Sequence, residues 1–475
     1  MANINIRPRA AVAERPPAVA PPSGNTRLGL HVTSDELAIW QTRSTSGPYK
    51  TAGDVSTNSP GDWDTIVSNS AQTLSADRWA GYTGAGCVPN SASLGGILPQ
   101  GDYIRDAAFR YLVTGTTSYR TAVLTELVAQ AGVAGVDFTN SSKWCVIATN
   151  ADNFFRPALW LCKYIFAWDY ILAGDQAWGN GPVNSGNQAT IEAWLLGGAN
   201  YFAAIYNTTM GLRFQDRLND DYTIIGGWVT NCATDWAIPW YGATSMKIGP
   251  GPSNRDLSII LPAALLGVQQ NNATLKSYGA RAFKEYIWYL MWADNTPLGD
   301  MDRWDTGAPC LGLVYTLTSY GTLAMIADAL ARTGDTSLYD FSTSTGACGT
   351  AGGPKTYLGG MNELAKMIDH TYLRYGTSTA GNNGNAAYLI DTNDGVGGGN
   401  SVLDHVFSQP NLYYQSTYIK ELYMRTGAGQ NGYTLPAYPA SPATGGYYAW
   451  GNAWGIEPAT MLMFGQMEGQ VDPFP

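Results

Sequence analysis

The chain has 475 residues, of which 45% are hydrophobic and 13% charged, and its formal net charge at pH 7 is −10. This composition excludes a largely disordered chain, because enough apolar side chains are present to form a large core. The acidic balance and the lack of any basic run argue against a nucleic-acid partner, since no cationic surface is available to neutralise phosphates.

The start of the chain is rich in proline and alanine, which is typical of an extended arm. We expect residues 1–27 to form this arm and residues 28–475 to form one folded domain. The N-terminus lacks an apolar run long enough for a signal peptide, and no run of 18 apolar residues follows for a transmembrane helix. The sequence therefore predicts no membrane partner and a location in the cytoplasm or on a phage particle. It leaves open whether the arm is a linker or attaches the chain to an assembly partner.

Helical periodicity dominates the chain after Leu28, and most of the expected helices come in consecutive pairs joined by short turns. Thr33 and Glu36 have the spacing of a capping box at the start of the first helix. The expected helices cover residues 33–43, 61–75, 101–115, 117–132, 152–172, 185–206, 231–246, 256–270, 272–294, 309–332, 358–375, 411–425 and 458–467.

Strand patterns are scarce in comparison. Only residues 386–391 alternate like a strand, and the Gly/Asn-rich stretches 376–400 and 427–455 are typical of long surface loops. Paired helices without a sheet, an internal linker or a fixed repeat predict one all-α domain, an (α/α) toroid, also described as an incomplete α/α barrel.

Metal-binding patterns are weak in this sequence. The six cysteines show no CxxC spacing and no Cys/His cluster, so a structural zinc site is not expected. The acidic loop that contains Asp300, Asp302 and Asp305 does not have the spacing of an EF-hand, so a structural calcium ion there is only weakly supported. We expect no cofactor.

Residues 309–332 are expected to form a helix that carries a catalytic residue. Tyr315 and Tyr320 on this helix point about 140° apart, at 100° per residue. Tyr320 shares its face with apolar residues and is expected to pack in the core. Tyr315 is expected to face a cleft, because its face of the helix is small or polar. That face consists of Gly312, Thr318, Ser319 and Thr322.

Three motifs, DAAFRYLVTGTTSY, FAWDYIL and YTLTSYGTLAMIADAL, resemble the alginate-lyase superfamily of polysaccharide lyases. The resemblance spans residues 102–335 as a pattern rather than as a run of identities. It implies an incomplete α/α toroid that cleaves an acidic polysaccharide. The family's catalytic tyrosine opens the helix that runs into an L-x-M-I-A sequence, and counting back from Met325 this tyrosine is Tyr315. Chondroitin-type relatives have a Tyr-Gly ending, and alignment with them selects Tyr320 instead.

The resemblance also implies an Asn–His pair and an arginine upstream of the tyrosine. Asn231 matches the asparagine, but the next residue is Cys232 where the family has histidine. Arg303 is the nearest upstream arginine, and it lies further from the tyrosine than in the family. We expect that His405, one of only three histidines in the chain, takes the place of the missing histidine, or that the site works without a histidine.

β-Elimination from a uronate explains why these residue types are needed. The proton on the sugar carbon next to the carboxylate is barely acidic, so donors such as Asn231 and Arg303 must stabilise the enolate-like charge that develops. A tyrosine whose pKa falls from about 10 beside a cation can remove this proton and then protonate the leaving oxygen. The residues expected to bind the acidic polysaccharide are Trp304, Trp228, Trp236, Arg156 and Tyr222.

Two other classes of protein stay open. Inverting glycosidases on α/α toroids use two carboxylates, which Asp221, Asp235 or the three aspartates of the acidic loop can supply. A non-catalytic glycan-binding or structural component of a phage particle is the third class, because no signal peptide is expected on this chain.

Overall fold

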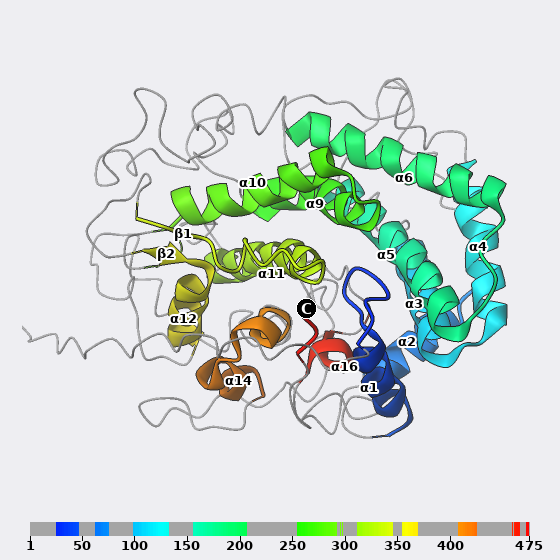
Figure 1. Cartoon of the computed structure of the whole chain (residues 1–475), viewed down its shortest axis with the longest axis horizontal. Coiled ribbons are helices and arrows are strands. Elements are labelled where there is room, and N and C mark those ends of the chain that lie inside the picture. Colours follow the sequence, from blue (N-terminus) through cyan, green and yellow to red (C-terminus); the bar gives the residue numbers. More distant parts are fainter. Residues whose placement is uncertain are drawn as a thin grey trace, which may run out of the picture.

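The computed structural model describes residues 25–46, 62–75, 98–132, 155–206, 254–291, 295, 297, 311–344, 354–368, 407–424, 458, 460–465 and 472–474. Every structural statement below concerns these residues. Figure 1 shows a mainly helical molecule with a short two-stranded sheet at one side.

The helices within these ranges are α1 (Ser34–Thr45), α2 (Asp62–Ser70), α3 (Leu98–Thr114), α4 (Thr117–Ala131), α5 (Phe155–Trp178), α6 (Ser185–Ile205), α9 (Asn254–Gln269), α10 (Ala273–Tyr289), α11 (Leu311–Ala331), α12 (Tyr357–Ile368), α14 (Thr417–Met424) and α16 (Thr460–Phe464). Residues 407–414 are also helical. Strands β1 (Ser342–Thr343) and β2 (Lys355–Thr356) pair in antiparallel orientation. No helix in the described part of the chain is long and apolar enough to cross a membrane.

Local sequence explains where several helices begin and end. Thr33 caps α1 through the expected capping box: its hydroxyl accepts from the backbone N–H of Glu36, and the Glu36 carboxylate accepts from the backbone N–H of Thr33. Helices α3, α5, α9 and α11 are each followed within three residues by a left-handed residue, which ends the helix without strain when it is glycine. These residues are Gly115, Gly179, Asn271 and Gly334, with φ of 70°, 65°, 53° and 92°.

Side-chain contacts show that α3, α5, α9 and α11 run parallel to one another. The contacting pairs advance together along neighbouring helices: Asp102–Lys163 and Tyr111–Asp175 between α3 and α5, and Phe155–Arg255 and Asp169–Gln269 between α5 and α9. Between α10 and α11 the order is reversed, since Gly279 lies against Ile326 and Tyr286 packs on Tyr320. Because a short turn makes α10 antiparallel to α9 as well, α11 is parallel to α9.

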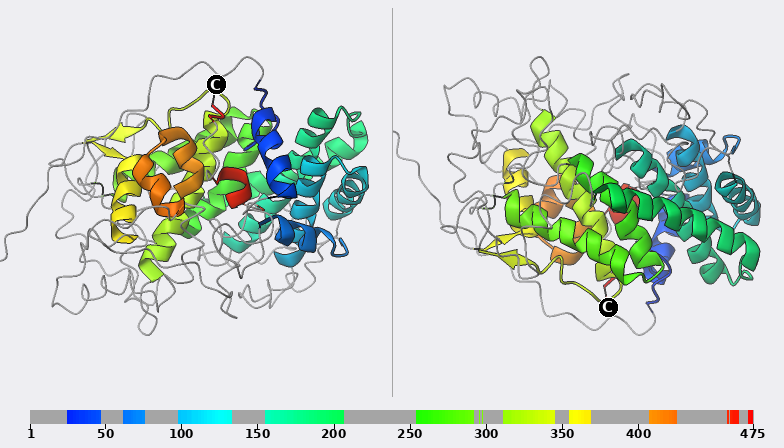
Figure 2. Two further views of the ribbon diagram at one scale, coloured as in Figure 1. Left: turned by 90° about the horizontal axis from the view of Figure 1, so that it is seen from below. Right: turned by 90° about the horizontal axis from the view of Figure 1, so that it is seen from above.

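The paired helices form two layers around an arc, as expected for an incomplete α/α toroid. Figure 1 shows α4, α6 and α10 on the outer side of α3, α5, α9 and α11. Both views in Figure 2 place α12 and α14 at the end of the molecule opposite to α2, α3 and α4. The interior between the layers is apolar and aromatic, with Trp160, Trp168, Tyr170 and Trp288 almost fully buried.

Segments from the two ends of the chain close the open side of this arc. Helix α1 contacts both α3 and α16, and α16 also contacts α2. The Trp40 indole N–H donates to the backbone carbonyl of Met463 at 2.9 Å. Arg43 donates to the carbonyl of Leu462 at 2.7 Å. These bonds satisfy carbonyl groups at the end of α16, where helical partners are lacking.

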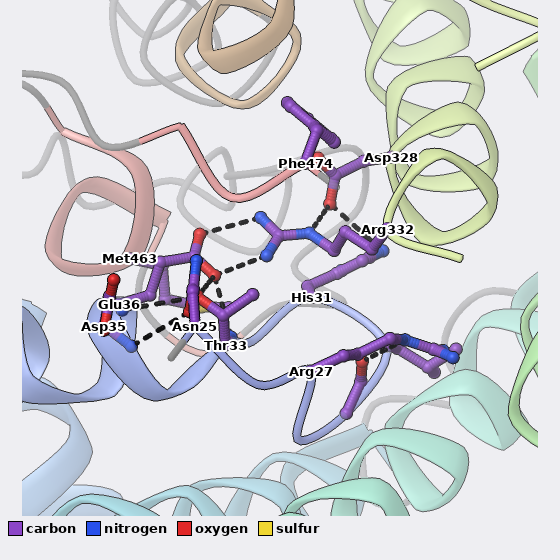
Figure 3. A network of polar contacts seen from close by, with 12 residues as sticks. Asn25, Arg27, His31, Thr33, Asp35, Glu36, Asp328, Arg332, Met463 and Phe474 are labelled. Atoms are coloured by element: carbon purple, nitrogen blue, oxygen red, sulfur yellow. Dashed lines mark hydrogen bonds and ion pairs between the residues drawn. The ribbon is translucent and has the colours of Figure 1, made fainter. Parts of the chain in front are cut away.

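A buried charge network, which we name the closing cluster, consists of Glu36, Asp328 and Arg332 and joins α1 to α11 (Figure 3). The Arg332 guanidinium donates to both carboxylate oxygens of Glu36, one of them at 2.8 Å, and its Nε donates to Asp328 at 2.6 Å. Gln409 adds a hydrogen bond to Asp328 at 3.3 Å, and the guanidinium carbon lies 5.7 Å from the ring centre of Phe474. The cluster therefore attaches the beginning and the end of the described chain to one helix.

His31 lies beside the closing cluster, and the sequence analysis assigns it no catalytic role. Its Nε2 is 3.1 Å from the carbonyl oxygen of Met325 and 4.0 Å from Asp328, and its ring contacts the ring of Phe166 at 5.4 Å between centres. The neighbouring backbone N–H of Leu30 donates to Asp169 of α5. Since these residues are all buried, this segment holds the first residues of the domain in the core.

Several expected boundaries differ from the structure. The expected helix 411–425 is wrong, because Gln415 has a φ of 53° and separates the helix of residues 407–414 from α14. The Asn411 side chain accepts from the backbone N–H of Ser416 at 2.8 Å and stabilises this break. Helix α5 continues to Trp178, beyond the expected end at residue 172, and Gly174 leaves room there for the Tyr111 ring.

Other expectations concern parts of the chain that the structure does not describe. These are the expected helix 231–246, the expected strand 386–391, and the expected loops 376–400 and 427–455. The sequence does not predict β1 or β2. Within the expected arm, Thr26 donates to Ser34 at 3.0 Å and Arg27 forms a β-bridge with Thr33, so packing against α1 begins before residue 28. The arm itself, residues 1–24, stays a prediction.

Candidate active site

The two ends of the parallel helices differ in how the chain connects them. At one end, short turns join α3 to α4, α5 to α6 and α9 to α10; these turns are residues 115–116, 179–184 and 270–272. At the other end, which we name the long-connection end, much longer segments join α4 to α5, α6 to α9 and α10 to α11; these are residues 132–154, 206–253 and 290–310. Because long connections carry function more often than short turns, the candidate active site lies at the long-connection end.

Nearly all predicted site residues belong to this end by their place in the chain. Arg156 is in the first turn of α5, and Tyr315 is in the second turn of α11. The backbone is described at both positions, whereas the two side chains lie outside the described part. The other predicted residues lie wholly outside the described residues: Tyr222, Trp228, Asn231 and Trp236 between α6 and α9, Arg303 and Trp304 between α10 and α11, and His405 before residues 407–414. Their roles stay predictions.

The same holds for the alternatives that depend on acidic residues. The residues concerned lie outside the described residues, so the paired-carboxylate glycosidase and the calcium ion stay predictions; they are Asp221, Asp235, Asp300, Asp302 and Asp305. Among the residues that are described, no group of three or more His, Cys, Asp or Glu side chains could hold a metal ion.

The helix dipoles of four parallel helices point their positive ends toward the long-connection end. Helices α3, α5, α9 and α11 all begin there, and N-terminal N–H groups favour anions. The first turns of α3, α5 and α11 contain no acidic residue that would neutralise this effect, whereas α9 has Asp256. The Arg255 guanidinium carbon lies 5.6 Å from the ring centre of Phe155, which confirms that α5 and α9 begin side by side.

An ion cluster joins the first halves of α3 and α5. Asp102 accepts from Arg105 at 3.0 Å and from Lys163 at 2.7 Å; its side chain is 28% exposed, whereas both cations are 5% exposed. Asp106 accepts from Arg105 and from Asn69, and burial raises the pKa of Asp106 to about 6 although Arg105 opposes the shift. The sequence analysis missed this cluster, because its only local signal is the i, i+3 spacing of Asp102 and Arg105.

A second group of titratable side chains lies where α6 and α10 end beside the start of α9. Glu285 is buried and accepts from Arg281 at 2.9 Å. Burial raises the pKa of Glu285 to about 7, and Arg281 only partly opposes this rise. Burial also raises the pKa of Tyr206 well above its usual range, and the charges of Glu285 and Asp256 add to the effect. Glu285 is therefore a carboxyl group that exchanges its proton near neutral pH.

Lys355 of β2 is a buried cation near the end of α10. Its ammonium group donates to the backbone carbonyls of Trp288 and Met291, the second at 3.3 Å. Burial lowers the pKa of Lys355 to about 8. In the described residues it has no carboxylate partner, so only carbonyl groups at a helix C-terminus stabilise its charge.

Tyr320 is a core residue, as the sequence predicts. It is fully buried, its ring stacks on Tyr357 with 5.0 Å between centres, and its hydroxyl donates to the sulfur of Met291 at 3.5 Å. Burial raises the pKa of Tyr320 well above its usual range, which is opposite to what a catalytic base requires. The structure therefore disfavours the chondroitin-type alternative, in which Tyr320 is the catalytic residue.

The polar face that was expected to line a cleft is buried instead. Thr318, Ser319 and Thr322 are at most 1% exposed, and the Thr322 hydroxyl donates to the backbone carbonyl of Thr318 at 3.0 Å. All side chains of α11 from residue 316 onward are buried, because α9, α10 and α12 cover this helix. The expectation that this face opens to a cleft was wrong, and face polarity does not distinguish Tyr315.

This arrangement of paired helices is an incomplete α/α toroid. Two structures of alginate lyase A1-III complexed with tetrasaccharide share it. A histidine-to-alanine variant gives a TM-score of 0.51 at 13% identity, with 93% of this chain and 96% of that chain covered. A tyrosine-to-phenylalanine variant gives a TM-score of 0.52 at 13% identity, with the same shares covered.

Alginate lyase A1-III from Sphingomonas species A1 has also been solved by crystallography, and this structure matches with a TM-score of 0.46 at 14% identity over 81% of this chain and 88% of that chain. No family model and no curated protein matches the sequence. The comparisons confirm the fold that the motif resemblance implies, and they give no support to a phage-particle component.

Proposed function

We propose that this chain is a polysaccharide lyase that cleaves a uronate-containing, alginate-like polysaccharide by β-elimination. The observation that carries the proposal is the α/α toroid shared with alginate lyase A1-III, together with the position of Tyr315. Tyr315 lies near the start of α11, at the long-connection end, where the shared family pattern has its catalytic tyrosine.

The proposed reaction needs an acid/base and a group that neutralises the substrate carboxylate. Tyr315 removes the proton next to the carboxylate and returns a proton to the leaving glycosidic oxygen. Asn231 and Arg303 bind the carboxylate and stabilise the enolate-like charge, and His405 completes this group. The N-termini of four parallel helices at the same end add a positive potential that suits an anionic polymer, although the chain as a whole is acidic.

The sugars flanking the scissile bond require aromatic and cationic contacts. Trp228, Trp236, Trp304 and Tyr222 are proposed to stack on pyranose rings, and Arg156 at the start of α5 is proposed to bind a further carboxylate. All five belong to the long-connection end by their position in the chain.

Incubation with a panel of acidic polysaccharides tests the proposal. β-Elimination creates a conjugated double bond that absorbs ultraviolet light, so we expect absorbance to rise with alginate or a related polyuronate. Reducing ends without this absorbance would instead identify a glycoside hydrolase. If neither signal appears with any polymer of the panel, the chain is not a lyase for these substrates.

A further inference from the structure

Trp178 at the end of α5 is the one large hydrophobic side chain that the described ranges leave exposed, at 42%. Its indole N–H donates to the backbone carbonyl of Leu112 at 2.9 Å, so the orientation of the ring is fixed. A fixed aromatic ring loses little entropy when a ligand stacks on it, which distinguishes Trp178 from a mobile surface side chain.

One face of the Trp178 ring is covered by Gly115. A Cβ atom at Gly115 would lie 2.8 Å, 2.9 Å and 3.1 Å from the ring atoms Cδ2, Cε2 and Cε3. Because these atoms surround the centre of the indole, the glycine lies under the flat face of the ring. Gly115 has a φ of 70°, so both its backbone conformation and this close approach require glycine. The exposed fraction of Trp178 therefore belongs to the opposite face and the edge.

Polar contacts hold the end of the helix that carries the ring. Arg120 donates to both oxygens of Asp175, at 2.6 Å and 2.7 Å, and to the carbonyl of Gly181 at 3.1 Å. Asp175 also accepts from Tyr111, whose hydroxyl in turn accepts from Asn180 at 2.6 Å. These bonds attach the turn after α5 to α3 and α4.

Two hydroxyl groups lie beside Gly115 on the other turn. Thr114 and Thr116 are exposed, and their hydroxyls are hydrogen-bonded to each other at 2.9 Å. A fixed and exposed indole face is the kind of surface on which a pyranose ring stacks, because the sugar ring has an apolar face and a polar rim.

We propose that Trp178 is a secondary, non-catalytic binding site for one pyranose ring of a polysaccharide. A protein partner fits less well, because a stable protein interface needs a larger apolar patch, and the described residues around Trp178 provide a single aromatic face. The choice of an acidic polysaccharide as ligand rests on the proposed function.

The Trp178 site is remote from the candidate active site. Helix α5 has 24 residues and begins at the long-connection end, so at 1.5 Å per residue Trp178 lies roughly 35 Å from that end. A short oligosaccharide bound at the active site does not reach Trp178, whereas a long polymer does. The site therefore affects the affinity for polymer and leaves the turnover of short substrates unchanged.

Affinity electrophoresis in gels with alginate, polygalacturonate, hyaluronate or dextran tests the site directly. We expect the Trp178→Leu variant to lose about tenfold in affinity for the retaining polymer, and Trp178→Phe to keep part of it because a ring remains. Both variants lose the hydrogen bond to Leu112. If Trp178 had only a structural role, the two variants would therefore lose equal affinity for the polymer, in proportion to the fall in melting temperature. Ser337→Ala, an exposed change after α11, is the control and leaves retention unchanged.

Initial rates on polymer and on tetrasaccharide complete the test. A raised KM for polymer, with kcat and the rate on tetrasaccharide unchanged, is the expected result for Trp178→Leu. If wild type yields no ultraviolet-absorbing product but is retained and Trp178→Leu is not, the site stands and the proposed function fails. Three results would each overturn the site. The first is unaltered retention of Trp178→Leu, and the second is no retention of wild type in any gel. The third is a Trp178→Leu variant that changes its oligomeric state and not its retention.

Discussion

Two buried cations, Arg332 after the end of α11 and Lys355 near the end of α10, differ in what compensates their charge. Arg332, in the closing cluster after the end of α11, is bonded to the carboxylates of Glu36 and Asp328. Lys355, near the end of α10, is bonded within the described residues to backbone carbonyls only. The Arg332 charge is therefore fixed by ion pairs, whereas burial lowers the pKa of Lys355 to about 8.

The difference indicates that the residues that stabilise the fold and the residues proposed for catalysis lie in different parts of the molecule. The closing cluster joins segments from both ends of the described chain through ion pairs. Removal of Arg332 would leave the carboxylates of Glu36 and Asp328 buried without a cation. The long-connection end has a cation that loses its proton at modest cost, helix N-termini without acidic residues, and the predicted catalytic tyrosine. We expect changes in the closing cluster to affect unfolding and changes at Tyr315 to affect rate.

The largest effect is expected from Arg332→Met. This variant leaves Glu36 and Asp328 buried without their cation, and breaking a buried pair in this way costs about 3–5 kcal/mol of unfolding free energy. Chemical denaturation monitored by circular dichroism measures the change. The matched control is Arg281→Met, whose partner Glu285 can take up a proton near neutral pH and whose own side chain is 28% exposed. Equal stability losses for the two variants would contradict the comparison.

Tyr315→Phe is expected to lower the rate on the polymer by on the order of 10²-fold or more, because it removes the proposed acid/base, and to leave the melting temperature unchanged. Tyr320→Phe is the control on the same helix. It loses one hydroxyl contact in the core and keeps its activity. The reverse pattern in ultraviolet assays would show that the chondroitin-type alignment identifies the catalytic residue.

The smallest effect concerns Lys355 and depends on pH. Its pKa is about 8 in the folded chain and 10.5 in the unfolded chain, so above pH 8 the unfolded state binds more protons and stability rises with pH. Below pH 8 both states are protonated and this contribution is constant. We expect wild type to gain about 1 kcal/mol relative to Lys355→Met between pH 7 and pH 9. A pH-independent difference between the two denaturation curves would argue against a proton-labile Lys355.

Much of the fold follows from local sequence. The capping box at Thr33 and Glu36 and the glycines that end α3 and α5 act on their own neighbours, so the paired helices were predicted close to their observed bounds. The break at Gln415 was missed because a left-handed glutamine has no local signature. The pairing of Glu36 with Arg332 joins residues 296 positions apart, and no pattern in either helix indicates it.

The candidate site was less accessible to sequence reasoning. The burial of Tyr320 was predicted, since its helix face is apolar. The burial of Thr318 and Ser319 was not, because three other helices cover α11 and periodicity detects only one buried face. Trp178 stood out only when its exposure and its contact with Gly115 were known. The assignments of Asn231, Arg303 and Tyr315 depend on the family resemblance and stay proposals.

The bonds between α1 and α16 also determine when this chain can finish folding. Trp40 and Met463 are 423 positions apart, and the ribosome adds roughly 5–20 residues per second, so these bonds form roughly 20–80 s after α1 is made. The helical hairpins depend on contacts close in sequence and can form during this interval, whereas closure of the arc requires a very long loop. Closure of the arc by α16 is therefore expected to be a late step of folding, and until then the Trp40 ring of α1 can pack on Phe109 of α3, at 5.5 Å between ring centres.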